Sequence, residues 1–329
     1  GQAAAMQSQL NFSRDMEREA DRVGYGVMTE AGFEPQGFVT MFEKLQQAAR
    51  LNDNGSFPYL RSHPMTTERI ADAQARQQLL PARVVVATTP AHAMMAARAL
   101  VLTNPGVDVL RALTTDANSP TLASAVKARQ AGALYAGVMA EMKQRNFGAA
   151  RTVLQRLQSL PGLDVRAIRL ARLLAAELAL AAGDASQAVA GLDAKALVIH
   201  PNDRATRIQL AQSRVATQQA VQAKMAANEM SLWLSQHPRD ATAWLVLASA
   251  HELMGDRLRS IRAQAEARAV ELDAGAAVDR FKAAQILAHQ LANEGKLDAA
   301  GHMEASIIDA RLRELQKLWR EQALERGIN

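Results

Sequence analysis

Cysteine is absent from this sequence, and aromatic residues make up only 4% of it. Without cysteine the chain can form neither disulfides nor thiolate metal sites, and this absence fits any cellular compartment. Runs of β-branched residues are also scarce, and RVVVATT (83–89) is the only segment we would consider for a strand. The shortage of such segments argues against a β-sheet core.

Long apolar runs and blocks of like charge are lacking as well. No stretch approaches the roughly 20 apolar residues that a membrane-spanning helix needs. The formal net charge of +5 is modest for this length, and basic residues are scattered among acidic ones, so we do not predict nucleic-acid binding. The first ten residues, GQAAAMQSQL, have neither a charged n-region nor an apolar core, so we do not expect a signal peptide there.

The residues that are present favour helices. Ala, Leu, Arg and Gln are abundant, and these residues lose little conformational freedom in a helix. With 329 residues, 49% of them hydrophobic, the chain is too long for one small core. We therefore predict an all-α protein with a first domain over residues 1–80, a connecting segment over 81–120 and a repeat array over 121–329.

Three helices are predicted in the first 80 residues. Apolar residues recur at helical spacing between Ser13, the predicted N-cap, and Gly32, the predicted C-cap. A second helix follows Pro35, and a third starts near Thr66. In the connecting segment we expect one helix, around PAHAMMAARALVL (90–102).

The remaining residues contain five repeated helix–turn–helix units. Each has a small residue early in its second helix, and successive small residues lie 34 to 40 positions apart. A glycine stands five positions before three of these anchors, where the turn between two helices would fall. In the third unit Val221 occupies that place. The anchors are Ala150, Ala188, Ala226, Ser260 and Ala300, and the glycines are Gly183, Gly255 and Gly295.

This pattern resembles the tetratricopeptide repeat, which has a period of about 34 residues and small residues where its two helices touch. Residues 238–256 are the best match, with Trp244, Leu247 and Ala248 ahead of Gly255. Stacked hairpins would form an α-solenoid with one continuous core and a curved groove that binds protein or peptide partners. The alternative is an irregular helical domain.

Several arginines in the repeats suggest what such a groove would bind. They would favour acidic partners if their side chains are available, and they would otherwise be ordinary solvated surface. The residues concerned are Arg204, Arg207, Arg214, Arg257, Arg259 and Arg262.

Candidate chemistry lies near the start of the chain, in EREADRVG (17–24). Glu17 and Asp21 are four residues apart, so a helix places them on one face, where one carboxylate can bind a metal and the other can orient a ligand. In SHPMTTERIADA (62–73), His63 can serve a metal or an oxyanion and Arg69 can hold a carboxylate. Each residue alone is equally compatible with solvated surface.

Taken together in this order, the two segments resemble the second half of a zinc metallopeptidase domain. The family is the gluzincin group, which includes the membrane CAAX prenyl proteases and periplasmic bacterial relatives. Its helix carries a pattern written E-x-x-A-D-x-x-G, which corresponds to EREADRVG here. A GF-x-P turn follows at residues 32–35, and His63 and Pro64 precede Arg69 and a helix rich in small residues.

This resemblance implies a role for each residue. Glu17 would be the third zinc ligand, and Asp21 would orient a histidine ligand. His63 would lie near the zinc, either stabilising the transition state or coordinating the metal, and Arg69 would order that region. A peptidase domain joined to tetratricopeptide-like repeats is similar to periplasmic members of the group that act as proteases and chaperones in outer-membrane protein assembly. That machinery would supply the partners.

One essential motif is missing. A gluzincin needs His-Glu-x-x-His on a helix, which gives two zinc ligands and a general base. The nearest string is HELMG (251–255), in which Gly255 replaces the second histidine, so we interpret His251 as a packing or surface residue. We expect these residues to be the C-terminal part of a longer protease, with a pseudoenzyme as the alternative. Alone, the polypeptide should neither hold zinc tightly nor cleave peptides.

A further alternative is a helical scaffold unrelated to proteases, whose repeats bind proteins without any catalysis. We also expect the apolar face of residues 1–80 to lack some of its contacts, which would drive dimerisation. That face comprises Met16, Val23, Val27, Phe38 and Phe42.

Overall fold

A computed structural model describes residues 2–51, 67–78, 88–193 and 203–327. Within these ranges, side chains are described for residues 15–47, 67–78, 88–193 and 203–321. Within these ranges the chain is helical and contains no strand, which confirms the all-α prediction. The strand candidate at 83–89 lies mostly outside the described residues. None of the helices searched in the described ranges combines the length and apolarity that a membrane crossing requires.

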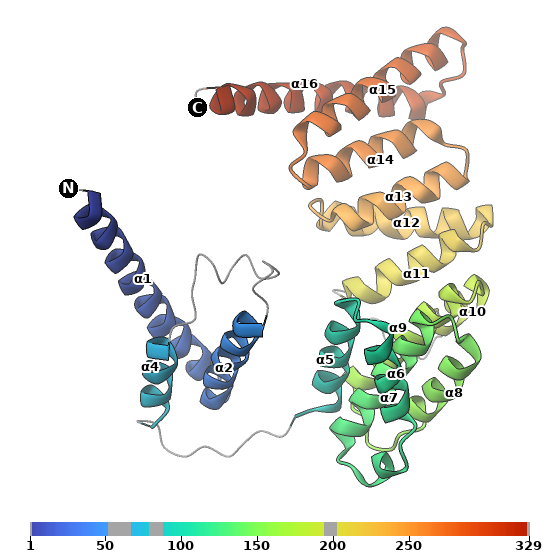
Figure 1. Cartoon of the computed structure of the whole chain (residues 1–329). Helices are drawn as coiled ribbons and strands as arrows, with labels where there is room; N and C mark the ends of the chain where they lie inside the picture. The colour runs from blue at the N-terminus through green and yellow to red at the C-terminus, as the bar shows by residue number, and fades with distance from the viewer. Residues whose placement is uncertain (1, 52–66, 79–87, 194–202, 328–329) are drawn as a thin grey trace. The chain divides into compact units, whose positions relative to one another are not determined.

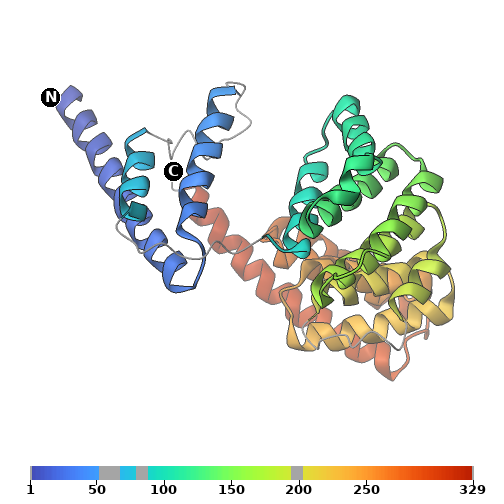
Figure 2. The same ribbon diagram turned by 90° about the horizontal axis from the view of Figure 1, so that it is seen from below.

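The chain divides into two compact units, residues 1–87 and 88–329. The first contains α1 (Gln2–Glu30), α2 (Pro35–Leu51) and α4 (Thr67–Gln78), and α4 packs against both other helices (Figure 2). Helix α1 begins at Gln2, so Ser13 lies inside it and the predicted N-cap is wrong. The alanine-rich lead-in AAAMQSQ has high helix propensity and extends the helix past Ser13.

The end of α1 follows the prediction. Gly32 has φ +83°, a left-handed conformation that glycine adopts without a Cβ clash. The amides of Gly32 and Phe33 donate to the carbonyls of Thr29 and Met28, at 3.1 Å each, and these bonds close the last turn. Pro35 then starts α2 at its first position, where its missing N–H costs nothing.

In its described residues the second unit has two leading helices, a short 3₁₀ segment and five helical hairpins (Figure 1). The leading elements are α5 (Pro90–Leu102), α6 (Val107–Ala117) and η1 (Pro120–Ser124). The hairpins are α7 (Lys127–Lys143) with α8 (Phe147–Gln158), α9 (Val165–Ala181) with α10 (Ala185–Leu192), α11 (Arg204–Ala216) with α12 (Ala220–Gln236), α13 (Ala241–Leu253) with α14 (Arg257–Val270), and α15 (Ala274–Asn293) with α16 (Ala299–Gly327).

The segment that we expected to connect two domains, residues 81–120, contains a second helix besides the predicted one. Both α5 and α6 pack on α7, and Met94, Val101 and Ala117 belong to the same buried cluster as α7 and α8. Gly137 of α7 permits this packing, because a Cβ there would lie 2.4 Å from the Cβ of Ala117. Residues 90–117 are therefore part of the core of the repeat unit.

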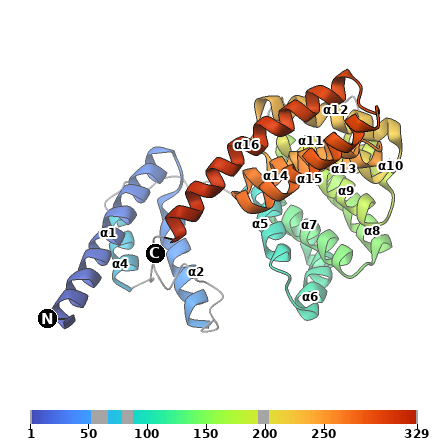
Figure 3. The same cartoon turned by 90° about the horizontal axis from the view of Figure 1, so that it is seen from above.

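The predicted small anchors hold in four of the five hairpins. Ala150, Ala188, Ala226 and Ser260 are completely buried where each second helix meets its neighbours. The fifth anchor, Ala300, is exposed. Helix α16 begins at Ala299 and packs beside α15 (Figure 3), so Ala300 lies in its first turn. The residues that α16 buries are instead Ile308, Leu312 and Leu315.

Left-handed residues make the turns between paired helices. Gly183, Gly255 and Gly295 have φ between 66° and 85°, as their position before the anchors predicts. In the first hairpin Arg145 takes this conformation, and in the third Gln218 does, with φ 62° and 58°. Because α12 begins at Ala220, Val221 lies inside that helix, and the expectation that it occupies the turn is wrong.

Aspartates begin most of the repeat helices and also connect successive hairpins. Each accepts a hydrogen bond from a backbone amide in the first turn. Asp203 also pairs with Arg169 of the preceding hairpin, and Asp240 pairs with Arg204 and accepts a 2.9 Å hydrogen bond from the indole of Trp233. The capping residues are Asp164, Asp184, Asp203, Asp240, Asp256 and Asp273.

Candidate functional site

Two carboxylates lie one helical turn apart on α1. The side chains of Glu17 and Asp21 are only 15% and 17% exposed, although the helix around them is largely solvated. Their neighbours Arg18, Glu19 and Arg22 are exposed and form surface ion pairs, Arg18 with Glu68 of α4 and Glu19 with Arg22. The structure therefore separates a partly buried acidic face of α1 from an exposed mixed-charge face.

Arg69 of α4 contacts both of these carboxylates. Its Nε and Nη2 atoms donate to the two oxygens of Asp21 at 2.7 Å each, and Nη1 lies 3.0 Å from Oε2 of Glu17. This is the bidentate fork that a planar guanidinium offers to a carboxylate. The Arg69 side chain is 8% exposed, so solvent screens these contacts weakly.

An apolar cluster between α2 and α4 lies next to Arg69. Val39 and Phe42 of α2 pack with Ile70 and Ala73 of α4, which follow Arg69 by one and four positions. The guanidinium carbon of Arg69 also lies 5.2 Å from the centre of the Phe42 ring, a favourable cation–π distance. The cluster fixes α4 against α2 and thereby sets where Arg69 can reach on α1.

Tyr25 continues this arrangement one turn further along α1. Its ring meets Phe38 edge to face with the ring centres 5.5 Å apart. Its hydroxyl is buried, and within the described residues it has no hydrogen-bond partner. Burial raises the pKa of Tyr25, so the phenol stays protonated at neutral pH.

The described residues do not by themselves fit a zinc ion. Catalytic zinc needs three protein ligands and an open position for water. Throughout the ranges in which side chains are described, no three His, Asp or Glu side chains come together in a way that could hold a metal. Glu17 is the one predicted ligand inside those ranges, and it already shares Arg69 with Asp21.

The structure thus brings together three of the four residues that we singled out. Glu17, Asp21 and Arg69 form one cluster, whereas His63 lies in residues 52–66, outside the described residues. The assigned roles of ligand, orienting residue and transition-state partner stay predictions. Tyr25 was missed, and Phe42 was predicted only as part of the apolar face and not as a residue that contacts Arg69.

The predicted basic face of the repeats is mostly engaged in ion pairs. Arg214 contacts Asp193 and Glu229, and Arg262 contacts Glu304 at 2.9 Å. Arg204, Arg207 and Arg259 also have carboxylate partners, and Arg257 is exposed. Most of the arginines chosen from the sequence therefore connect neighbouring helices.

His251 is a packing residue, in agreement with its interpretation from the sequence. Its side chain is 12% exposed and lies 3.8 Å from a carboxylate oxygen of Asp256. Burial lowers the pKa of His251, which keeps the ring neutral near neutral pH. With Gly255 four positions on, this helix turn offers no second imidazole.

Comparison with known proteins supports the metallopeptidase resemblance. Residues 1–77 match Peptidase family M48. The chain is 29% identical over 323 residues to the Beta-barrel assembly-enhancing protease of Escherichia coli strain K12, covering 96% of this chain and 60% of that protein. It is 24% identical over 316 residues to the Yersinia pestis protein of the same name, with the same coverage.

A shorter match adds a third relative. The Putative beta-barrel assembly-enhancing protease of Vibrio cholerae is 33% identical over 79 residues, which are 24% of this chain and 16% of that protein. The chain thus spans 60% of the length of the curated relatives that it matches along most of its own sequence. The resemblance to a metallopeptidase with appended helical repeats, stated above from its motifs, is confirmed.

Proposed function

We propose that this chain works as part of a periplasmic zinc metallopeptidase that acts in outer-membrane protein assembly. The match of residues 1–77 to Peptidase family M48 supports the peptidase assignment. Relatives named Beta-barrel assembly-enhancing protease, similar over 96% of the chain, support the process. In this proposal the first unit contributes Glu17 to the zinc site, and the repeats bind protein partners or substrates.

The observation that carries the proposal is the position of Arg69 between Glu17 and Asp21. Asp21 uses both carboxylate oxygens on the guanidinium, so it is a positioning residue and not a free ligand. A metal ligand must be held within a few tenths of an ångström, and partners around it provide that restraint. Arg69 fixes the rotamer of Glu17 and leaves the pair of carboxylates with a net charge of −1, which suits a cation nearby.

The zinc ion, when bound, would polarise a peptide carbonyl and lower the pKa of a water molecule. The sequence contains no His-Glu-x-x-His, so residues 1–329 include neither the two histidine ligands nor the general base of a gluzincin. Those groups would have to come from outside these residues. We expect the chain alone to bind zinc weakly and to cleave no peptide.

The alternative function is a protein-binding scaffold without catalysis. The repeat unit favours it, because in its described residues, 88–193 and 203–327, the buried clusters join one packed hairpin to the next. Retention of envelope proteins by residues 88–329 alone would be expected under both functions. Catalysis therefore decides between them.

The test joins a His-Glu-x-x-His segment from a peptidase of family M48 ahead of residue 1. We expect this protein to degrade an unfolded model substrate, and Glu17→Gln to abolish that activity. Glu19→Gln is the matched control, because Glu19 lies on the same helix and pairs with Arg22 at the surface. Full activity of the Glu17→Gln protein would contradict the proposed role of Glu17. If the joined protein without any substitution is inactive, that result favours a protein-binding function without catalysis.

A further inference from the structure

Four aliphatic side chains are exposed around the connection between α5 and α6, at residues 100–109, which we call the α5–α6 tip. They are Leu100, Leu102, Val107 and Val109, and each is between 43% and 56% exposed. Single apolar residues are common on protein surfaces, but several that gather in one short segment form a patch that favours an interaction partner.

The tip is fixed on the core of the repeat unit. Val101 and Leu110 on its two sides are buried in the same apolar cluster as α7. Because neighbouring residues of a helix point in different directions, burial of Val101 keeps Leu100 and Leu102 at the surface. The amides of Thr103 and Asn104 close the last turn of α5 on the carbonyls of Leu100 and Val101. Exposure of these side chains therefore follows from the packing of α5 and α6.

Two cations lie at the C-terminal end of α7, beside the tip. Nζ of Lys143 donates to Oδ1 of Asn104 at 2.8 Å, which holds the ammonium group at the connection. Arg145 follows in the turn after α7 and is exposed, with its guanidinium carbon 5.9 Å from the centre of the Phe147 ring. Neither cation forms an ion pair with a carboxylate of the described residues.

The acidic side chains nearby are engaged elsewhere. Residues 88–107 contain neither Asp nor Glu. Glu141 of α7 is buried and accepts a hydrogen bond from the side-chain amide of Asn146 at 3.0 Å. Asp108 is fully exposed and lies 3.8 Å from Arg111, so that surface pair is weak. The charges left without a partner at this end of the repeat unit are those of Lys143 and Arg145.

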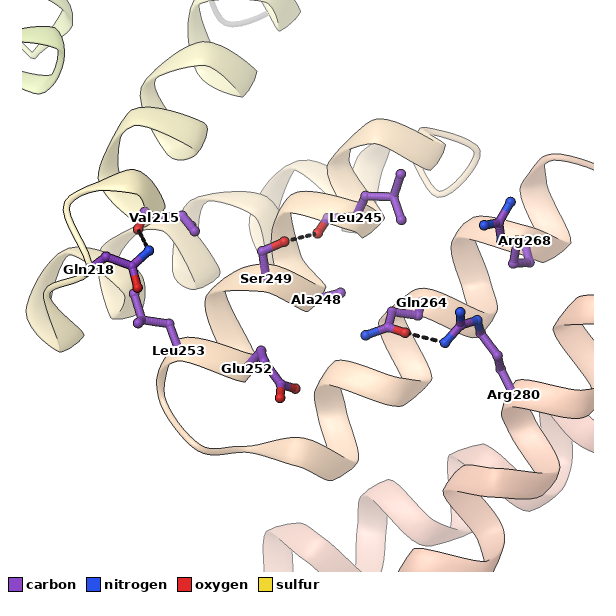
Figure 4. A pocket seen from close by; sticks show the side chains of 10 residues that line it. All are labelled: Val215, Gln218, Leu245, Ala248, Ser249, Glu252, Leu253, Gln264, Arg268 and Arg280. Atoms are coloured by element: carbon purple, nitrogen blue, oxygen red, sulfur yellow. Dashed lines mark hydrogen bonds between the residues drawn. The ribbon is translucent and has the colours of Figure 1, made fainter. Parts of the chain in front are cut away.

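Cations in the hollows of the repeat unit differ from these two. Arg268 lines a hollow of about 580 Å³ and pairs with Glu271 at 3.0 Å (Figure 4). In the same hollow Arg280 donates to the amide oxygen of Gln264, and Glu252 adds an acidic group. Those cations are held by groups of the chain itself, so they select no charged ligand.

Arg145 also stands where glycine is the easier residue. It precedes the anchor Ala150 by five positions, as Gly183 and Gly255 precede their own anchors. Its φ of 62° is left-handed, a conformation that strains any residue with a Cβ. A strained backbone is expected where the side chain has a use that offsets the strain.

We propose that the α5–α6 tip docks on the surface of a bilayer that contains anionic phospholipid. Leu102 and Val107 would enter between the headgroups, and Lys143 and Arg145 would contact lipid phosphates. Exposed aliphatic residues beside free cations suit such a surface, because apolar burial and attraction to lipid charge act together. This docking needs neither zinc nor a protein partner, so its failure would leave the proposed function standing.

The first test is sedimentation of the full 329-residue chain with vesicles made of equal parts of phosphatidylcholine and phosphatidylglycerol. We expect binding that weakens with added salt and is about tenfold weaker on phosphatidylcholine alone. Lys143→Gln combined with Arg145→Gln should weaken it by about tenfold or more. Lys282→Gln combined with Arg313→Gln is the matched control, because both residues are exposed on the last hairpin, and it should change binding by no more than about twofold.

The apolar half of the tip is tested in the same way. Leu102→Ser combined with Val107→Ser should weaken binding by about tenfold or more, since less apolar area enters the bilayer. Val165→Ser combined with Ile286→Ser removes two aliphatic side chains that are 82% and 68% exposed elsewhere, and should leave binding unchanged. Circular dichroism melting verifies that each variant is folded.

Arg145→Gly separates membrane contact from a structural role. Glycine relieves the strain at this turn, so the melting temperature should rise while vesicle binding falls. A variant that is more stable and binds vesicles as well as the unmodified chain would contradict the role of Arg145.

Insertion of the tip can be followed directly, because the sequence contains no cysteine. A polarity-sensitive dye attached to Val107→Cys should shift its emission to the blue on vesicles that contain phosphatidylglycerol, whereas the same dye on Val165→Cys should not. No binding by the unmodified chain, or equal losses in the tip and control variants, would overturn the proposal. So would a dimer in solution that Leu102→Ser with Val107→Ser converts to a monomer, because the tip would then face a second copy.

Discussion

The two units of this chain differ in what holds their helices together. In the first, a small apolar cluster and one arginine between two carboxylates join three helices. In the second, each hairpin buries apolar residues against the hairpins before and after it. A repeat array of the second kind gains stability from every neighbour, whereas the first unit depends on a few specific contacts. The contacts of the first unit are concentrated on Arg69 and the apolar cluster beside it, whereas those of the second unit are spread along the whole array.

Arg69→Met tests most strongly whether the first unit depends on a few specific contacts. The substitution removes the cation shared by Glu17 and Asp21, both of which are mostly buried. We expect the free energy of unfolding of the first unit to fall by about 3–5 kcal/mol, since one side of a buried ion pair is left behind. Hydrogen exchange should show faster exchange in α1 and α4 and unchanged exchange in residues 88–327.

Arg18→Met is the control for that experiment. Arg18 pairs with Glu68 across the same two helices, but its side chain is 44% exposed and that of Glu68 is 57% exposed. This substitution should cost no more than about 1 kcal/mol. Equal effects of the two substitutions would show that burial of the Arg69 cluster does not matter.

Gly137→Ala tests whether close apolar packing governs the second unit. The added Cβ would lie 2.4 Å from the Cβ of Ala117, so α6 and α7 must separate. We expect the free energy of unfolding to fall by about 1–3 kcal/mol in urea titrations followed by circular dichroism. Gly148→Ala, where the new Cβ meets nothing within 4 Å, should be neutral or stabilising. A Gly137→Ala protein that is more stable than the unmodified chain would show that α6 does not pack closely against α7.

Acid should weaken the repeat unit through its capping aspartates. Burial by itself raises the pKa of Asp203 and of Asp240. Hydrogen bonds from Arg169 and Thr206 to Asp203, and from Arg204 and Trp233 to Asp240, outweigh burial and lower each pKa to about 2. Because the unfolded pKa is 3.8, the stabilisation is complete above about pH 4 and is lost as the pH falls toward 2. We expect a loss of roughly 1–2 kcal/mol per group after solvent screening.

The measurement for this prediction is urea unfolding at several pH values between neutral and pH 2. Asp203→Asn and Asp240→Asn should each be less stable than the parent at neutral pH and should show a shallower decline in acid. An unchanged decline in both variants would place the acid sensitivity elsewhere in the repeat unit.

The smallest expected effect concerns a turn. Leu272 follows α14 in a left-handed conformation with φ 64° and is 80% exposed. Leu272→Gly should stabilise the repeat unit by about 0.5–1 kcal/mol, because glycine adopts this conformation without steric cost. Leu232→Gly, at an exposed position inside α12, should destabilise it by about 1 kcal/mol. Thermal melting of the two variants should therefore shift in opposite directions.

The sequence was most informative where a residue type has one dominant physical role. Gly32, Gly183 and Gly255 mark left-handed turns because glycine alone lacks the Cβ that would clash there. Small anchors such as Ala150 predicted helix contacts for the same steric reason. The N-cap prediction at Ser13 was wrong because the alanine-rich residues before it also favour a helix, so α1 begins at Gln2 instead.

Contacts between distant residues were harder to predict. Glu17 and Asp21 could be placed on one face of α1 from their spacing, but the position of Arg69 between them depends on how α4 packs on α2. Nothing local in the sequence distinguishes Arg280 from Arg262, yet Arg262 has a carboxylate partner, whereas Arg280 donates to the amide oxygen of Gln264. Availability of a charge is a property of tertiary packing.

The central claim is that Glu17 is a zinc ligand held in place by Arg69 and Asp21, and zinc titration calorimetry tests it most directly. The protein that carries an added His-Glu-x-x-His segment should bind one zinc ion tightly, and Glu17→Gln should weaken that binding by about 100-fold or more, whereas Glu19→Gln leaves it unchanged. Asp21→Asn should weaken it by about 10- to 100-fold. Unchanged zinc affinity in Glu17→Gln would contradict the account.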